Sequence, residues 1–343
     1  MFSGTSSDIG VAVVGAGLMG RWHADACARA NARLVATVDA NLEAARRLSA
    51  RYPGCHATTD LEEALANPAV TVLHVCTPGP THVPIATRAL ERGRHVLVEK
   101  PLAETADATR ALLAVADARR RLICPVHQCR FARGVLQARR WLDAVGPPVH
   151  LDAVICSAGA TGRPDDQLDD IVADILPHPL SLVADLTRVP LSGIAWSVTR
   201  AGSGECRISG RADGVSVGIL VSLGGRPTRH TMRVIGRAGS IEIDLFHGFA
   251  TRETGGVSRW RKIARPWSRS LRTLSASTVN LANRAGRREP AYPGLRELVR
   301  RFHGAVRGQN QSPISPADTQ AVADAREALM GALRRPGLCE PRP

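Results

Sequence analysis

The sequence predicts a two-domain protein of class α/β plus α+β, with an N-terminal doubly wound parallel sheet and a C-terminal domain built on a large, mostly antiparallel sheet. Three observations support this. A glycine-rich turn links an apolar run to helix-compatible sequence near the N-terminus. Strand-like and helix-like segments then alternate up to residue 126. Beyond that point, several period-two segments follow one another, separated by glycine turns. We therefore expect domains at 1–126 and 127–343, with the last helix, 316–333, a candidate to pack back on the first domain.

The glycine-rich turn predicts dinucleotide binding in a Rossmann domain. Residues 9–14 are apolar, as in a strand buried on both faces, and a helix is expected over 21–30. In the G-x-G-x-x-G pattern, the first glycine permits the turn, the second lets the backbone approach a pyrophosphate, and the third allows close helix–strand packing. The helix N-terminus then faces the phosphates. The cofactor-binding candidates here are Gly15, Gly17, Leu18, Met19 and Gly20.

Asp39 indicates which dinucleotide is bound. The next expected strand, 34–38, ends at this residue, 24 positions after Gly15. A carboxylate there accepts hydrogen bonds from the ribose hydroxyls and repels a 2′-phosphate, which favours NAD over NADP. Because Arg46 and Arg47 are close enough in sequence to meet a phosphate, NADP stays open as an alternative.

The rest of the first domain follows the doubly wound pattern. Helices are expected over 42–51, 61–65, 83–92 and 105–120, and strands over 70–75, 95–98 and 122–126. Loops at the carboxyl ends of parallel strands border the cofactor crevice. Segments 78–82 and 99–101 therefore belong beside the nicotinamide.

The second domain begins with a helix over 132–144 and a Gly-Pro-Pro break. Strands are expected over 149–156, 194–199, 206–211, 215–222, 231–235 and 240–245. A helix over 177–186 would cover this sheet, and 293–306 and 316–333 have the pattern of amphipathic helices.

Lysine usage singles out Lys100. The net charge is +14, but only Lys100 and Lys262 among the 45 basic residues are lysines. Since this chain uses arginine wherever a plain positive charge suffices, a remaining lysine calls for a reason particular to an ammonium group. Lys100 follows a predicted buried strand at the cofactor edge, where it could hydrogen-bond a reacting oxygen or relay its proton. The alternative is a structural ion pair with Glu99.

Several motifs together resemble the glucose–fructose oxidoreductase / inositol dehydrogenase (Gfo/Idh/MocA) family. They are the glycine turn with Trp22-His23-Ala24, Cys76-Thr77-Pro78 with His82, Glu99-Lys100-Pro101, His127-x-x-Arg130-Phe131 and Asp174-x-x-x-His178. The resemblance is strong over 8–131, looser to about 200, and beyond that rests on element order. It implies a Rossmann domain, a large antiparallel sheet, NAD or NADP as cofactor, and oxidation or reduction of carbinol groups on sugars, inositols or nucleotide sugars.

The resemblance assigns catalytic roles to Lys100, Asp174 and His178, with His178 as acid/base and Asp174 as its positioning partner. The chain departs from the family pattern here, because it lacks the glycines that usually precede the Asp and separate it from the His. Pro177 and Pro179 fit only the first turn of a helix, so His178 is expected at a helix N-terminus. Alternatively, this histidine merely caps or packs.

Other candidates are weighed against structural roles. His82 either lies near the nicotinamide ribose or anchors its loop, whereas Thr77, Pro78 and Glu99 are expected along the cofactor. Arg130 binds substrate or braces the hinge between the domains. Tyr292 reaches the pocket or seals an apolar seam. His23 is expected to pack, and no metal site is predicted, because no second ligand cluster accompanies Asp169, Asp170 and Asp174.

A basic stretch at 226–307 has three interpretations. It contains eighteen basic and five acidic residues, with tryptophans interspersed. It is a solvated surface, a phosphate-recognition surface for an anionic substrate, or a contact with an anionic membrane or nucleic acid. No nucleic-acid-binding motif supports the last option.

Composition also indicates location and assembly. No apolar run is long enough to span a bilayer, and the first eight residues lack the features of a signal peptide. The eight cysteines form no C-x-x-C pair, which favours reduced thiols and a cytoplasmic protein. The resemblance implies a homo-oligomer. We therefore expect an NAD(P)-dependent oxidoreductase of sugars, cyclitols or nucleotide sugars; the alternative is a non-catalytic NAD(P)-binding sensor or co-regulator with the same fold.

Overall fold

The computed structural model describes residues 9–256 and 258–334, which fold as two compact units. The first unit contains the described chain up to His127 together with Leu295–Ala323, and the second contains Gln128–Gly294 and the chain from Asp324 onward. This division differs from the one expected from the sequence, in which residues 127–343 form a single C-terminal domain. The reason is that helix α10 (Leu295–Val306) packs against helix α1 (Leu18–Arg29) in the first unit.

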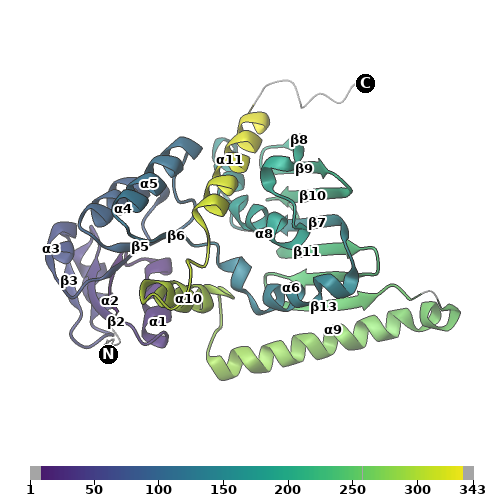
Figure 1. Cartoon of the computed structure of the whole chain (residues 1–343), viewed down its shortest axis with the longest axis horizontal. Coiled ribbons are helices and arrows are strands. Elements are labelled where there is room, and N and C mark those ends of the chain that lie inside the picture. Colours follow the sequence, from purple (N-terminus) through teal and green to yellow (C-terminus); the bar gives the residue numbers. More distant parts are fainter. Residues whose placement is uncertain (1–8, 257, 335–343) are drawn as a thin grey trace. The chain divides into compact units, whose positions relative to one another are not determined.

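The sheet of the first unit has six parallel strands in the order β3-β2-β1-β4-β5-β6 (Figure 1). Its strands are β1 (Gly10–Val14), β2 (Arg33–Val38), β3 (His56–Thr58), β4 (Val72–Val75), β5 (His95–Val98) and β6 (Ile123–Pro125). The strand order reverses between β1 and β4, which creates the crevice where doubly wound sheets bind ligands. The predicted doubly wound parallel sheet is confirmed.

Capping side chains mark the starts of some of the helices around this sheet. They are α1, α2 (Leu42–Ser49), α3 (Leu61–Ala66), α4 (His82–Glu91), α5 (Ala106–Ala118), α10 and the first part of α11 (Pro316–Leu333). The Asn41 side chain accepts the backbone N–H groups of Glu43 and Ala44 at the start of α2. The Asp60 side chain accepts the backbone N–H of Glu62 at the start of α3. Apolar side chains from β1, β4 and β5 are fully buried between the helices and the sheet.

The second unit is built on a seven-stranded sheet in the order β13-β12-β11-β7-β10-β9-β8 (Figure 1). Its strands are β7 (Pro148–Cys156), β8 (Ala195–Gly202), β9 (Glu205–Ala212), β10 (Val215–Ser222), β11 (Arg229–Gly236), β12 (Gly239–Asp244) and β13 (Phe249–Thr254). Only β7 and β10 pair in parallel. The predicted large, mostly antiparallel sheet is therefore confirmed. Sequence reasoning missed β13, an edge strand.

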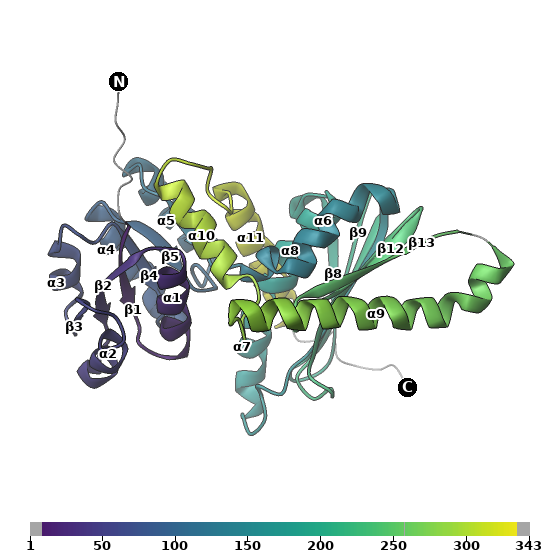
Figure 2. The same ribbon diagram turned by 90° about the horizontal axis from the view of Figure 1, so that it is seen from below.

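Four helices accompany this sheet: α6 (Arg133–Val145), α7 (Asp165–Ile175), α8 (Pro177–Thr187) and α9 (Arg259–Arg287). Helices α6 and α8 pack against strands of the sheet, and α9 runs along β13 (Figure 2). Neither α7 nor α9 was predicted. Helix α9 contains Pro266 and leaves its large apolar side chains exposed, so the usual signal of an apolar face buried against the core is absent.

Within the described ranges, no helix combines the length and apolar character needed to cross a membrane. The first eight residues, on which the absence of a signal peptide was argued, lie outside the described part. All seven cysteines in the described part are free thiols.

Candidate functional site

The glycine turn after β1 has the geometry of a pyrophosphate cradle. Gly15 has φ of 94°, and a Cβ there would lie 2.6 Å from the carbonyl oxygen of Cys76. A Cβ on Gly20 would lie 1.8 Å from the carbonyl oxygen of Gly15, so only glycine fits. At Gly17 a Cβ would meet no described atom within 4 Å. Gly17 is also the N-cap of α1 and has no side chain to cap the helix, so no capping side chain competes with a phosphate for the first N–H groups of α1.

Asp39 is fixed at the end of β2 by two backbone hydrogen bonds. Its Oδ2 accepts the N–H of Ala16 at 2.7 Å, and its Oδ1 accepts the N–H of Asn41 at 2.8 Å. Each carboxylate oxygen can accept a further hydrogen bond, which leaves capacity for the ribose hydroxyls. Arg46, one of the two arginines that could meet a 2′-phosphate, pairs with Glu43 at 2.9 Å. The arrangement fits NAD better than NADP.

His82 connects two loops at this edge of the sheet. The ring is 1 % exposed; its Nδ1 lies 2.7 Å from the Pro101 carbonyl oxygen and its Nε2 lies 2.8 Å from that of Thr77. The loop after β4 is further tightened by Thr81, whose hydroxyl donates to the Pro78 carbonyl oxygen at 2.7 Å. Since both ring nitrogens contact backbone carbonyls, the position of His82 matches the loop-anchoring interpretation.

Glu99 and Lys100 follow β5 at the same edge. Glu99 is 8 % exposed, its Oε1 lies 3.2 Å from His23 Nε2, and its Oε2 accepts the backbone N–H of Lys100 at 3.2 Å. The Lys100 side chain is half-buried, and the Lys100–Pro101 peptide bond is cis. Because the carboxyl ends of parallel strands share one edge of the sheet, the topology gathers the glycine turn, Asp39 and both loops there.

His178 lies in the first turn of α8 in the second unit, as the two prolines predict. Pro177 is the first residue of α8, and Leu176, between α7 and α8, keeps helical φ and ψ of −55° and −36°. His178 Nδ1 lies 3.5 Å from the Cys129 sulfur, and the ring is half-buried. Asp174 is exposed in the last turn of α7. The four-residue spacing therefore spans a helix junction rather than one regular helix.

Arg130 and Tyr292, the candidate substrate ligands, also lie in the second unit. Arg130 Nη2 is 3.7 Å from Asp185 Oδ1, and Asp185 Oδ2 accepts from Arg139 Nε at 2.7 Å. Arg130 thus braces the short helix 128–131 against α8. Tyr292 has φ of 50° and is half-buried, two residues before the end of this part of the second unit.

Sequence reasoning missed several contacts at these residues. No signal in the sequence indicated the contact of Cys129 with His178 or of Asp185 with Arg130. Each pair joins segments about fifty residues apart, so no local pattern records it. His23 was expected to pack, and it is fully buried. Its ring nevertheless contacts both Glu99 and His74.

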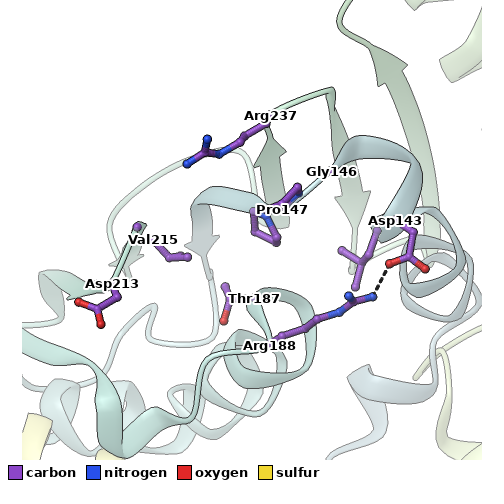
Figure 3. Close-up of a pocket in the computed structure, with 11 residues that line it drawn as sticks. Asp143, Gly146, Pro147, Thr187, Arg188, Asp213, Val215 and Arg237 are labelled. Carbon is purple, nitrogen blue, oxygen red and sulfur yellow. Dashed lines mark hydrogen bonds and ion pairs between the residues drawn. The ribbon is translucent and has the colours of Figure 1, made fainter.

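A cavity of about 460 Å³ in the second unit lies away from His178 (Figure 3). It is lined by Thr187 and Arg188 at the carboxyl end of α8, where Arg188 Nη2 pairs with Asp143 Oδ1 at 2.7 Å. His178 lies at the opposite end of this helix, about 15 Å along its axis. The cavity is therefore separate from the predicted catalytic histidine.

Part of the chain is similar to proteins of a known family. Residues 9–127 match the model of GFO_IDH_MocA, the oxidoreductase family with an NAD-binding Rossmann fold. The chain is 36 % identical to inositol 2-dehydrogenase 4 of Saccharopolyspora erythraea over 163 residues, covering 47 % of this chain and 44 % of that protein. It is 35 % identical to inositol 2-dehydrogenase of Mycolicibacterium smegmatis over 189 residues, covering 53 % and 52 %. The matched region spans about half the length of these relatives.

Similarity to solved structures extends over nearly the whole chain. The WlbA dehydrogenase of Bordetella pertussis, solved with NADH and UDP-GlcNAcA, has 17 % identity and a TM-score of 0.75, covering 96 % of both chains. At this identity the likeness shows a shared fold.

Proposed function

We propose that this chain, whose residues 9–127 match the GFO_IDH_MocA family of NAD-binding oxidoreductases, transfers a hydride between nicotinamide C4 and the carbinol or ketone carbon of a sugar, cyclitol or nucleotide sugar. The observation that carries the proposal is the position of Lys100. It directly follows β5, at the edge of the sheet where the glycine turn and Asp39 also lie. An ammonium at the cofactor edge fits proton transfer and charge stabilisation at a reacting oxygen.

The cofactor of the Rossmann unit is NAD, which supplies the hydride acceptor or donor when bound. The turn from Gly15 to Gly20, including Leu18 and Met19, borders the pyrophosphate. Asp39 accepts hydrogen bonds from the adenosine ribose. Thr77, Pro78 and Glu99 border the nicotinamide half, with His82 holding their loops together.

In the proposed reaction, Lys100 hydrogen-bonds the reacting oxygen and His178 takes or returns its proton. A histidine suits this role because its imidazole changes protonation near neutral pH. Asp174 positions His178 or binds a neighbouring substrate hydroxyl. Arg130 and Tyr292 contact the substrate.

The substrate class rests on the relatives. Two of them are named inositol 2-dehydrogenases, and a structural neighbour was solved with a nucleotide sugar. A polyhydroxylated ring is common to both ligand types. An anionic substrate, such as a phosphorylated or nucleotide-linked sugar, would suit the excess of basic residues over 226–307.

The test combines turnover with cofactor affinity. The protein is assayed with NAD⁺ and a panel of inositols, sugars and UDP-sugars, and with NADH and the matching keto compounds. Lys100→Met should lower kcat by about 100-fold or more while the Kd for NADH, measured by fluorescence, stays unchanged. Lys262→Met is the matched control, since it removes the only other lysine, an exposed residue of α9.

Two outcomes would contradict the proposal. Equal loss of activity in both lysine variants would remove Lys100 from the chemistry. Tight NADH binding without turnover on any of these substrates would instead favour the non-catalytic sensor or co-regulator. The altered sequence around Asp174 is the feature that supports this second candidate.

We also propose a homo-oligomer that works in the cytoplasm. The free thiols of the described cysteines suit a reducing compartment. Size-exclusion chromatography with light scattering measures the assembly, and a monomer at micromolar concentration would contradict it.

A further inference from the structure

A buried polar cluster in the first unit serves none of the proposed roles. Cys27 on α1, His74 on β4 and His303 on α10 are each 0 % exposed. These elements otherwise pack through apolar side chains, and burying polar groups in such a core is costly unless strong partners compensate. The cluster therefore calls for an explanation other than hydrophobic packing.

The donor atoms have the separations of metal ligands. Cys27 Sγ lies 3.8 Å from His74 Nε2, and His74 Nε2 lies 3.3 Å from His303 Nε2. One ligand atom from each of the three residues falls within 4.8 Å of the others. In a tetrahedral zinc site, bond lengths of about 2.05 Å to nitrogen and about 2.3 Å to sulfur place two nitrogens about 3.3 Å apart and a nitrogen and sulfur about 3.6 Å apart.

The surrounding hydrogen bonds support His74 in this role. Its Nδ1 lies 3.0 Å from His23 Nδ1, and His23 Nε2 lies 3.2 Å from Glu99 Oε1. If His74 binds a cation through Nε2, its Nδ1–H donates to His23 and the Nε2–H of His23 donates to the carboxylate. Every proton in this chain then has an acceptor. Metal-binding histidines commonly donate their second N–H to such a partner, which fixes their orientation.

His303 Nδ1 has no hydrogen-bond partner among the described residues. A buried nitrogen without a partner is rare, and an ion or a water molecule is a common reason for it.

The charges of the cluster also balance. Imidazole rings bind a cation in their neutral form. A bound cation would stabilise the thiolate form of Cys27. One thiolate and the Glu99 carboxylate together neutralise a divalent ion.

We propose that Cys27, His74 and His303 form a binding site for a soft or borderline transition-metal cation, with Zn²⁺ the best match in geometry and charge. Thiolate and imidazole ligands select zinc or copper(I) over magnesium or calcium. Three protein ligands leave one further coordination position. Because the ligands come from α1, β4 and α10, the ion would fasten α10 to the Rossmann sheet. None of its three ligands takes part in the proposed oxidoreductase activity, although Glu99, which is proposed to border the nicotinamide, ends the hydrogen-bond chain from His74.

The first experiment measures metal content. The full chain, produced without a histidine tag and dialysed after incubation with ZnCl₂, should retain about one zinc per chain by elemental analysis. Cys27→Ser and His303→Gln should retain none above background. Cys206→Ser is the matched control, because Cys206 is another buried free cysteine, on β9 in the second unit, and this variant should keep the metal.

The second experiment starts with the wild-type protein, so its first result does not depend on how well the variants fold. Co²⁺ added to the wild-type protein should give a thiolate-to-cobalt charge-transfer band, which added Zn²⁺ abolishes. Zinc should also raise the Tm of wild type and of Cys206→Ser but not of Cys27→Ser. A parallel titration with copper(I) distinguishes the two candidate ions by relative affinity.

Two results would overturn the proposal. One is a wild-type protein that keeps no metal and gives no cobalt–thiolate band. The other is equal metal content in Cys27→Ser, His303→Gln and wild type. Either would leave the cluster as a set of neutral, hydrogen-bonded core residues.

Discussion

Gly17 and Gly20 lie three residues apart in one turn, yet they need to be glycine for opposite reasons. At Gly20 a Cβ would overlap the carbonyl oxygen of Gly15, so the fold itself excludes a side chain. At Gly17 the space is open, and a side chain would occupy the volume that a pyrophosphate needs. The sequence pattern predicted the close packing at Gly20, which the structure has, because it depends only on the local strand–turn–helix geometry; the pyrophosphate role of Gly17 stays a prediction.

His95 makes the stability of the first unit depend on pH. Its Nδ1 accepts the N–H of Leu122 at 3.0 Å, and burial, aided by the Arg121 charge, lowers its pKa to about 4. In the unfolded chain a histidine has a pKa of about 6.5. Between these values the unfolded state binds more protons than the folded state, so stability falls as the pH is lowered from about 6.5 to about 4.

We expect His95→Gln, which keeps an acceptor but does not titrate, to lose less stability than wild type between about pH 7 and about pH 5. Urea unfolding at both pH values measures this difference. His56→Gln, at an exposed histidine of the same unit, should follow the wild-type profile. Parallel pH profiles for His95→Gln and wild type would show that this histidine is not responsible.

Among the elements, α9 departs most from expectation. Its 29 residues include eight basic and no acidic side chains. Arg265 and Arg269 pair with Glu253 on β13 and Glu242 on β12, so part of its charge is used within the unit. Its tryptophans, Trp260 and Trp267, are instead 79 % and 78 % exposed. The basic stretch is therefore not simply a solvated surface, since several of its arginines hold a helix to a sheet edge.

The loops after β4 and β5 are held as one element by His82. Removing this ring would leave the carbonyl oxygens of Thr77 and Pro101 without their partner. We expect His82→Ala to cost about 1–3 kcal/mol in the free energy of unfolding and to weaken NADH binding. Denaturant unfolding and NADH titration measure the two effects.

His56→Ala is the control for this prediction, because its ring is exposed and pairs with Glu63 at 2.9 Å. Its stability should stay within about 0.5 kcal/mol of wild type. Unchanged stability and NADH affinity in His82→Ala would mean that the loops are held by other contacts.

At the scale of the whole molecule, the proposed reaction assigns both Lys100 and His178 to one oxygen of the substrate. Residues that act as a unit give strongly non-additive effects on rate. The double variant Lys100→Met/His178→Gln should therefore have nearly the same kcat/KM as whichever single variant has the lower kcat/KM.

Steady-state kinetics of the four proteins in this cycle test the prediction. Lys100→Met combined with Arg188→Gln is the control, since Arg188 lies at the far end of α8. Losses that multiply in the Lys100/His178 pair, as in the control pair, would argue that the two residues act in separate steps.

The sequence alone determined the Rossmann unit, because its signals are local: an apolar strand, a glycine turn, capping residues and an acidic residue at the end of the next strand. It also predicted the antiparallel sheet, through strands such as β9 in which buried and exposed side chains alternate. It placed His178 in a first helical turn, because proline permits little else.

Only the tertiary structure decided which distant residues meet. The proposed metal ligands are an example: 47 positions separate Cys27 from His74, and 229 separate His74 from His303. No sequence spacing of known metal motifs links them. Sequence also gave no sign that α10 packs in the first unit, because most of the second unit precedes it in the chain. It gave no sign that arginines of α9 pair with glutamates of β12 and β13. Such contacts depend on how elements pack in space, and hydrophobic periodicity records which face of an element is buried but not which element covers it.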